Sequence, residues 1–308
     1  MKIGKIIERA TKSIILTPAT LARYGTLRPT RVRLDGCTNW IHIDPADRRS
    51  IKKFVHDPLR RRTSPPLAFW RDFMEKLNPE VAIDVGVNYG ECLFGARYAE
   101  KTAVYGFEAN PRLAPYLRKS RNDHPDAERI TIVEGLVSDA IADDIPFYAD
   151  PSWSGTGSAV STLNHGPSVV TTRIKARTID SVIPRGLVDG ATLLFKMDIE
   201  GYEPRAFDGF RETIDAAKLA VGFIEFDTTY IREAGGNPET YFGGLSRKFN
   251  IHRLSGRKGG TLVNVRGFAD LPISKAEDQR IHTDLLLTTL GAGTATWLPG
   301  HWTITRNP

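Results

Sequence analysis

Residues 81–90, of sequence VAIDVGVNYG, constrain the fold of this chain more than any other stretch. Residues 81–85 form an apolar run with one Asp, which predicts a buried strand. Residues 86–90 form a glycine turn, and residues 91–99 have helical character. Glycine lets the backbone approach a ligand closely because it has no Cβ, and a helix N-terminus suits a carboxylate or phosphate. The stretch therefore predicts half of a nucleotide-binding βαβ unit.

A second apolar run follows at residues 103–107 and ends in Glu108, 22 positions after Gly86. An acid about 20 residues after the glycine turn binds ribose hydroxyls in nucleotide-binding βαβ units. The alternative is a pair of buried parallel strands with no ligand. An acid at the end of an apolar strand is costly without a partner, so the spacing favours a nucleotide-type cofactor.

The turn differs from the dinucleotide fingerprint G-x-G-x-x-G. Asp84 stands where the first glycine would fall, followed by Gly86, Asn88 and Gly90. The order D-x-G-x-N-x-G resembles motif I of S-adenosylmethionine-dependent methyltransferases. The resemblance implies that the turn holds the methionine part of the cofactor and that Glu108 holds its ribose.

Further motifs lie at residues 107–111 (FEANP), 178–180 (TID) and 194–203 (LFKMDIEGYE). Together with the turn, they make residues 80–289 resemble the FkbM family of methyltransferases. Val87 and Ala109 depart from the family pattern by small apolar changes. The resemblance implies an α/β fold, with a Rossmann-like, seven-stranded, mostly parallel sheet and a late antiparallel strand.

The same resemblance implies S-adenosyl-L-methionine as the cofactor. Residues 135–139 follow the third strand, close to where family members place the adenine. The expected cofactor-binding residues are Asp84, Gly86, Asn88, Tyr89, Gly90, Glu108, Ala109, Asn110, Leu136, Ser138 and Asp198.

Acidic residues gather at the predicted carboxyl ends of the strands, where open α/β sheets bind ligands. They are Asp84, Glu108, Asp198, Glu200, Glu225 and Asp227. Methyl transfer to an alcohol needs a general base or a divalent metal. Asp198 and Glu200 lie two apart and would share a face of the strand, so we expect Glu200 near the acceptor and Asp198 nearer the cofactor. The alternative is that Glu200 caps the next helix.

Several other groups could take part. Asp198, Glu200 and Glu225 offer the oxygen ligands that Mg²⁺ or Ca²⁺ prefers, but their spacing is not diagnostic, and we predict no metal. His165 and His252 are alternative bases, although a lone His is more often structural. Lys196 could pair with the acids and keep them ionised, or it could extend from the sheet to solvent.

Three units are expected along the chain: a basic N-terminal extension (1–66), the methyltransferase domain (67–290) and a C-terminal tail (291–308) with no clear period. Residues 1–78 carry 17 Lys and Arg against 7 Asp and Glu, whereas the rest carries 25 against 29. Residues 1–16 predict a basic amphipathic helix, which packs on protein or contacts a membrane surface or acidic partner. Residues 31–34 and 40–43 predict a hairpin, and residues 153–166 a mobile Gly/Ser-rich loop.

Composition indicates the class of protein and its cellular compartment. The chain is 41% hydrophobic and 25% charged, which is ordinary for a globular protein. Its two cysteines, Cys37 and Cys92, do not form a disulfide scaffold. With no apolar run near 18 residues and no signal-peptide pattern, we expect a cytoplasmic protein.

The leading hypothesis is an O-methyltransferase. The resemblance implies a hydroxyl on a sugar, glycan, glycolipid or secondary metabolite, and the basic N-terminal segment suggests that this acceptor could be anionic. A nicotinamide-dependent oxidoreductase is the first alternative. Against it, this chain lacks the G-x-G-x-x-G fingerprint of such enzymes and an obvious Tyr-x-x-x-Lys pair. The second is a nucleic-acid or anionic-membrane binding module with an inactive core. Nucleic acid has no firm support, and a homo-oligomer stays open.

Overall fold

The computed structural model describes residues 18, 20–34, 36–37, 39–59, 63–151, 153–163, 168–255, 260–274 and 278–305. The amphipathic helix predicted over residues 1–16 and the alternative base His165 lie outside these residues.

A nine-stranded sheet forms the centre of the molecule, in the order β15-β13-β12-β14-β11-β10-β3-β4-β5. The neighbouring strands from β11 to β5 run parallel, and β14 is antiparallel to both β11 and β12. The predicted Rossmann-like methyltransferase sheet is therefore confirmed, with β13 and β15 added at one edge. The strands are β3 (Val81–Val85), β4 (Ala103–Glu108), β5 (Ile130–Glu134), β10 (Thr192–Met197), β11 (Leu219–Asp227), β12 (Phe249–Leu254), β13 (Thr261–Val265), β14 (His282–Thr289) and β15 (Thr303–Thr305).

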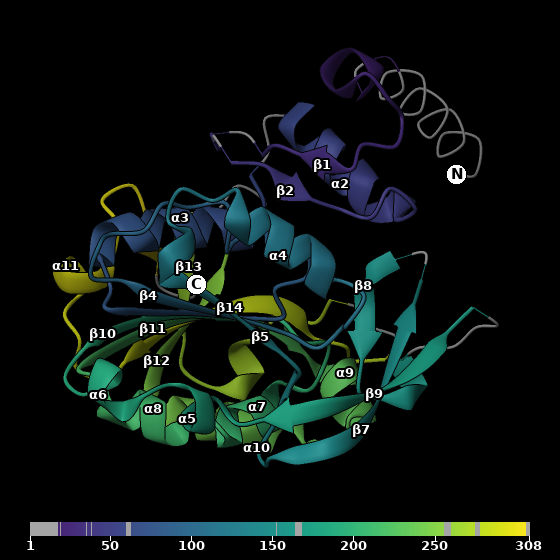
Figure 1. Ribbon diagram of the computed structural model, residues 1–308. Coiled ribbons are helices and arrows are strands. Elements are labelled where there is room, and N and C mark those ends of the chain that lie inside the picture. The colour runs from purple at the N-terminus through teal and green to yellow at the C-terminus, as the bar shows by residue number, and fades with distance from the viewer. Residues whose placement is uncertain are drawn as a thin grey trace, which may run out of the picture.

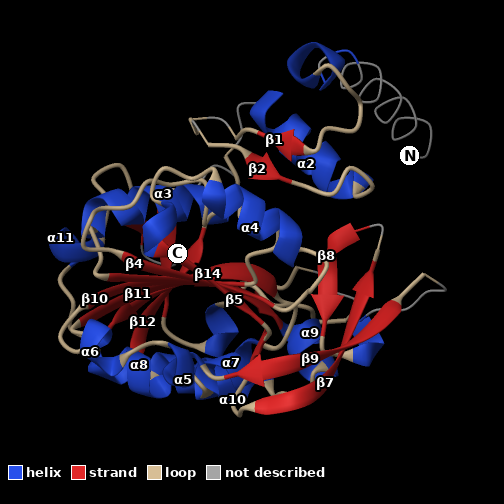
Figure 2. Ribbon diagram, in the orientation of Figure 1, coloured by secondary structure: helices blue, strands red, loops and turns tan. Residues whose placement is uncertain are grey.

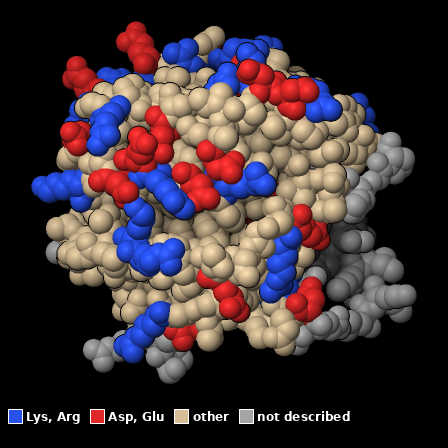
Figure 3. Space-filling model, turned by 90° about the horizontal axis from the view of Figure 1, so that it is seen from below, with Lys and Arg blue, Asp and Glu red and all other residues tan. Residues whose placement is uncertain are grey.

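Helices cover both faces of this sheet (Figures 1 and 2). One face carries α3 (Pro65–Leu77), α4 (Ala114–Asn122) and α11 (Thr294–Trp297). The other carries α5 (Ile179–Val182), α6 (Arg185–Val188), α7 (Glu203–Asp208), α8 (Arg211–Ala216), α9 (Thr228–Glu233) and α10 (Pro238–Ser246). Each helical layer closes a hydrophobic cluster against the sheet. Seen from below, the outer surface carries Lys and Arg interspersed with Asp and Glu, so neither positive nor negative charge dominates this face (Figure 3).

A second sheet has the order β6-β9-β7-β8 and lies beside the carboxyl ends of the parallel strands. Its strands are β6 (Leu136–Val137), β7 (Ala142–Asp150), β8 (Trp153–Ser158) and β9 (Val170–Arg177). The mobile loop predicted at residues 153–166 is therefore wrong for its first part. A Cβ at Gly155 would lie 3.0 Å from the Trp153 indole, and one at Gly157 would lie 2.7 Å from the Phe147 ring. These glycines therefore make room for aromatic rings and do not indicate a flexible loop.

Two predicted helices differ in the structure. Residues 88–95 form consecutive turns, so the helix predicted over 91–99 is wrong; Gly90 and Gly95 disfavour a helix there. The sequence also predicts one helix from Glu203 to about Ile214, but the structure divides this segment into α7 and α8 at Gly209. A Cβ at Gly209 would lie 2.1 Å from the carbonyl oxygen of Ser138, so this close backbone contact requires glycine and interrupts the helix.

The N-terminal and C-terminal segments pack on the α3 side of the sheet. Strands β1 (Arg31–Val32) and β2 (Ile41–His42) pair antiparallel, as the predicted hairpin requires, and α2 (Arg48–Leu59) follows. Near the C-terminus, β15 pairs with β13, and Trp302 packs edge-on against Phe73 of α3. These C-terminal residues thus extend the sheet, although the sequence shows no period there. Among the described residues, no helix combines the length and apolar character needed to cross a membrane.

Candidate active site

A cavity of about 280 Å³ opens at the carboxyl ends of the parallel strands. The structure brings together most of the residues predicted from the sequence: its wall includes Asp84, Gly86, Asn88, Tyr89, Glu108, Ala109, Leu136, Asp198, Glu200 and Glu225. Gly90, Asn110 and Ser138 are not part of this wall. The cavity thus lies where the βαβ prediction placed the cofactor.

The glycine turn after β3 has a backbone that other residues would not adopt easily. Gly86 has φ +80°, and a Cβ there would lie 1.9 Å from the carbonyl oxygen of Asp198. Gly90 has φ +87° and leaves room for the ring of Phe94. The turn is therefore tight because it packs directly on the end of β10, and this contact forms one wall of the cavity.

Glu108 bridges the turn and the segment after β4. Its carboxylate accepts hydrogen bonds from the backbone N–H groups of Asn88 (2.6 Å) and Asn110 (2.8 Å). Burial raises the pKa of Glu108 to about 7. Asn110 therefore contributes to the site through its backbone, which orients the carboxylate.

Lys196 joins the acids beneath the turn. Its Nζ donates a hydrogen bond to the carbonyl oxygen of Gly86 (2.9 Å) and lies 3.3 Å from Asp84 and 3.9 Å from Asp198. The side chain is buried, so the prediction that it pairs with the acids is confirmed, and the alternative of a solvent-directed Lys is wrong. Burial raises the pKa of Asp84, although Lys196 opposes this shift.

Three carboxylates meet at the other end of the cavity. Asp198, Glu200 and Glu225 each offer one oxygen, and these oxygens lie within 4.8 Å of one another. Burial and the neighbouring acids raise the pKa values of Glu200 and Glu225. A hard divalent cation could bind such oxygens; the absence of a metal stays a prediction. The N-cap of α7 is Tyr202, so Glu200 does not cap this helix.

Buried acceptors in the cavity wall lack hydrogen-bond partners among the described residues. They are the amide oxygen of Asn88 and one carboxylate oxygen of Glu225. A buried acceptor without a donor is unfavourable. The wall therefore fits a ligand rich in donors, such as one that carries an ammonium group and ribose hydroxyls.

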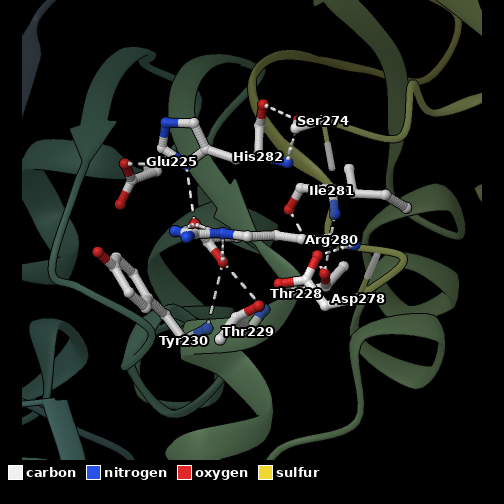
Figure 4. Close-up of polar contacts among 10 residues, drawn as sticks. Glu225, Thr228, Thr229, Tyr230, Ser274, Asp278, Arg280, Ile281 and His282 are labelled. Atoms are coloured by element: carbon white, nitrogen blue, oxygen red, sulfur yellow. Dashed lines mark hydrogen bonds and ion pairs between the residues drawn. The ribbon is translucent and has the colours of Figure 1, made fainter. Parts of the chain in front are cut away.

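Lys53 of α2 and Trp153 of β8 line the cavity from outside the βαβ unit. The sequence indicated a basic N-terminal segment and a Gly/Ser-rich loop beginning at residue 153, but it assigned neither side chain to the cofactor cavity. Sequence reasoning also missed His282, whose Nδ1 lies 2.9 Å from the buried Asp227 and 3.7 Å from Glu225 (Figure 4). A search for polar residues at the start of the strand beside β11 would have found it.

Asp227 is the centre of a buried polar network. It accepts hydrogen bonds from the backbone N–H groups of Thr229 and Tyr230 at the start of α9, and it pairs with Arg280. Figure 4 labels these three partners. These partners outweigh burial and lower the pKa of Asp227 to about 2. Asp227 is therefore a structural acid. The alternative base His252 is also structural, because it is buried against Trp297 and burial lowers its pKa to about 4.

The fold and this cavity fit a methyltransferase that uses S-adenosylmethionine. A model of the methyltransferase FkbM domain matches residues 84–249, more than half of the chain. The protein belongs to the FkbM family. S-Adenosylmethionine is therefore its cofactor, in agreement with the glycine turn, with Glu108 and with the buried amide oxygen of Asn88 that lacks a partner among the described residues.

Solved structures of low sequence identity resemble this chain. One is an O-methyltransferase from Bacillus cereus in complex with S-adenosylhomocysteine, with 11% identity and a TM-score of 0.36, covering 72% of this chain and 79% of that one. Another is a SAM-dependent methyltransferase from Aquifex aeolicus, with 13% identity and a TM-score of 0.37, covering 77% and 96%. These values are too low to support an argument on the substrate. No curated protein matches the chain.

Proposed function

We propose that this protein transfers a methyl group to a hydroxyl oxygen of a sugar-containing acceptor. The observation that supports this proposal is the group of carboxylates from Asp198, Glu200 and Glu225 at the end of the cofactor cavity. A hydroxyl is a poor nucleophile at neutral pH and needs a base within hydrogen-bond reach. A cofactor cavity that ends in carboxylates suits this requirement.

Each side chain has a distinct role in this proposal. When bound, S-adenosylmethionine supplies a methyl group on a positively charged sulfur. Asp84 and Asp198 face the positive charges of the cofactor, and Lys196 holds these acids in place. Glu200 accepts the hydroxyl proton of the acceptor. The pKa of Glu200, raised by burial, approaches the working pH, which is favourable for a general base.

The wall formed by α2 and β8 supports the choice of acceptor. Trp153 lines the cavity, and the guanidinium carbon of Arg49 lies 4.8 Å from the centre of its ring. An aromatic ring offers a flat apolar face for a sugar ring, and an arginine binds phosphate or carboxylate groups. We therefore include anionic sugars in the acceptor class. A cytoplasmic setting is part of the proposal because Cys37 and Cys92 are both free thiols.

An acceptor screen with S-adenosylmethionine labelled in its methyl group would test this function. Neutral methyl glycosides, sugar phosphates and a simple amine would be compared. We expect label in a sugar hydroxyl, a loss of at least about 100-fold in Glu200→Gln, and a weaker effect in Trp153→Ala. Glu212→Gln, on the exposed surface of α8, is the matched control. Label in the amine alone, or full activity of Glu200→Gln, would refute the proposal.

A further inference from the structure

Helix α2 brings a cation to the cofactor cavity, although it lies outside the residues that the family model matches. Lys53 lines the cavity, and its Nζ lies 3.0 Å from a carboxylate oxygen of Glu91, the residue directly after the glycine turn. Glu91 also accepts a hydrogen bond from the hydroxyl of Ser64 (2.8 Å). The ammonium group of Lys53 is therefore held at the turn end of the cavity.

Buried contacts fix α2 in this position. Asp47, just before the helix, accepts hydrogen bonds from the backbone N–H of Ser154 (3.0 Å) and from the hydroxyl of Tyr89 (3.4 Å). The ring of Phe54 packs edge-on against Tyr89, with 6.2 Å between ring centres. These contacts tie α2 both to β8 and to the glycine turn. The backbone that carries Lys53 is thus positioned by the cavity wall itself.

The charge balance of the cavity gives Lys53 a particular role. Among the described residues that line it, the cations are Lys53 and Lys196. Lys196 already contacts the carbonyl oxygen of Gly86 and the carboxylates of Asp84 and Asp198. A lysine ammonium has three donors. Among the described residues Lys53 forms one ion pair, with Glu91, so donors of its ammonium group are left for a ligand. Lys53 is therefore the lining cation that can bind a ligand anion.

The cofactor carries such an anion. The methionine part of S-adenosylmethionine has an α-ammonium and an α-carboxylate. The buried acids suit the ammonium, but the carboxylate would be repelled by Asp84, Glu91 and Asp198 without a cation beside it. We propose that Lys53 binds the α-carboxylate of the cofactor, so that α2 completes the cofactor site.

This proposal rests on the cofactor assignment and on the position of the turn. The Lys53 side chain is 57% exposed, and the carboxylates of Glu91 and Asp198 raise its pKa. Lys53 therefore carries its charge throughout the neutral pH range.

Calorimetric titration with two ligands tests the assignment. S-Adenosylhomocysteine has the amino-acid end, whereas 5′-methylthioadenosine keeps the adenosine and the sulfur but lacks this end. In Lys53→Met we expect the Kd for S-adenosylhomocysteine to rise about 10- to 100-fold, the range for a lost hydrogen bond between charged groups. The Kd for 5′-methylthioadenosine should stay unchanged. Lys53→Arg should retain most of the affinity.

The control is Lys52→Met, because Lys52 is exposed on the same helix and does not line the cavity. It should bind both ligands as the wild type does. Unchanged binding of S-adenosylhomocysteine by Lys53→Met would overturn the proposal, and so would an equal loss for both ligands, which would indicate a displaced helix. A wild-type protein that bound neither ligand would overturn the cofactor assignment as well.

Discussion

Replacing Lys196 by Met tests the buried charge network under the glycine turn. The Lys196 and Asp84 side chains are 7% and 1% exposed, and their charged atoms lie 3.3 Å apart. Removing one partner of a buried ion pair typically costs about 3–5 kcal/mol, because the other charge is left without compensation. A typical domain has a free energy of unfolding of roughly 5–15 kcal/mol. We therefore expect Lys196→Met to fold with a clearly reduced stability.

The pH dependence of the stability of Lys196→Met shows whether the unpaired charge of Asp84 causes the loss. Burial already raises the pKa of Asp84 above 3.8, and Lys196 opposes this shift. Without Lys196, the folded-state pKa rises further, so Asp84 stabilises the fold in its protonated form. That stability is present below the unfolded pKa and is lost as the pH rises through the folded pKa, by about 1.4 kcal/mol per unit. Lys196→Met should thus be less destabilised at pH 5 than at pH 8.

Urea unfolding followed by circular dichroism gives the free energies. The double variant Asp84→Asn/Lys196→Met should be more stable at pH 8 than Lys196→Met, because the buried charge of Asp84 is removed together with its partner. Lys218→Met is the control, since Lys218 is exposed and should change stability by less than about 0.5 kcal/mol. A loss in Lys196→Met of less than about 1 kcal/mol, or the same loss at both pH values, would refute the reasoning.

Two further predictions concern the turn and the Asp227 network. In Gly86→Ala, the new Cβ would clash with the Asp198 carbonyl at a φ of +80°, so calorimetry should detect no binding of S-adenosylhomocysteine; wild-type affinity would contradict the structure. The pKa of Asp227 falls from 3.8 to about 2, which stabilises the fold by about 2 kcal/mol above pH 4. This stability should disappear as the pH falls from 4 to 2, and urea midpoints should show a smaller acid dependence in Asp227→Asn than in the wild type.

Much of the core could be predicted from local sequence patterns. Apolar runs that end in acids mark buried parallel strands and their carboxyl ends, and this rule placed Asp84, Glu108 and Asp198 on one cavity. The sequence left two positions open for the Lys196 side chain, and the structure decided between them by placing its Nζ 3.3 Å from Asp84 on the neighbouring strand. The prediction of a mobile loop at residues 153–166 was wrong for its first part. Gly155 makes room for an aromatic ring within a strand and does not make a loop flexible.

The sequence by itself determined three features: the glycine turn, the acids at the strand ends and the match to the family model over residues 84–249. Only the tertiary structure showed that α2 and β8 close the cavity. Asp47 and Ser154 are 107 positions apart, and Lys53 meets Glu91 across a helix and a strand. Contacts between distant segments leave no periodic trace in either segment, since each side chain is locally compatible with an exposed position. Packing alone decides that Lys53 and Ser154 line the cavity.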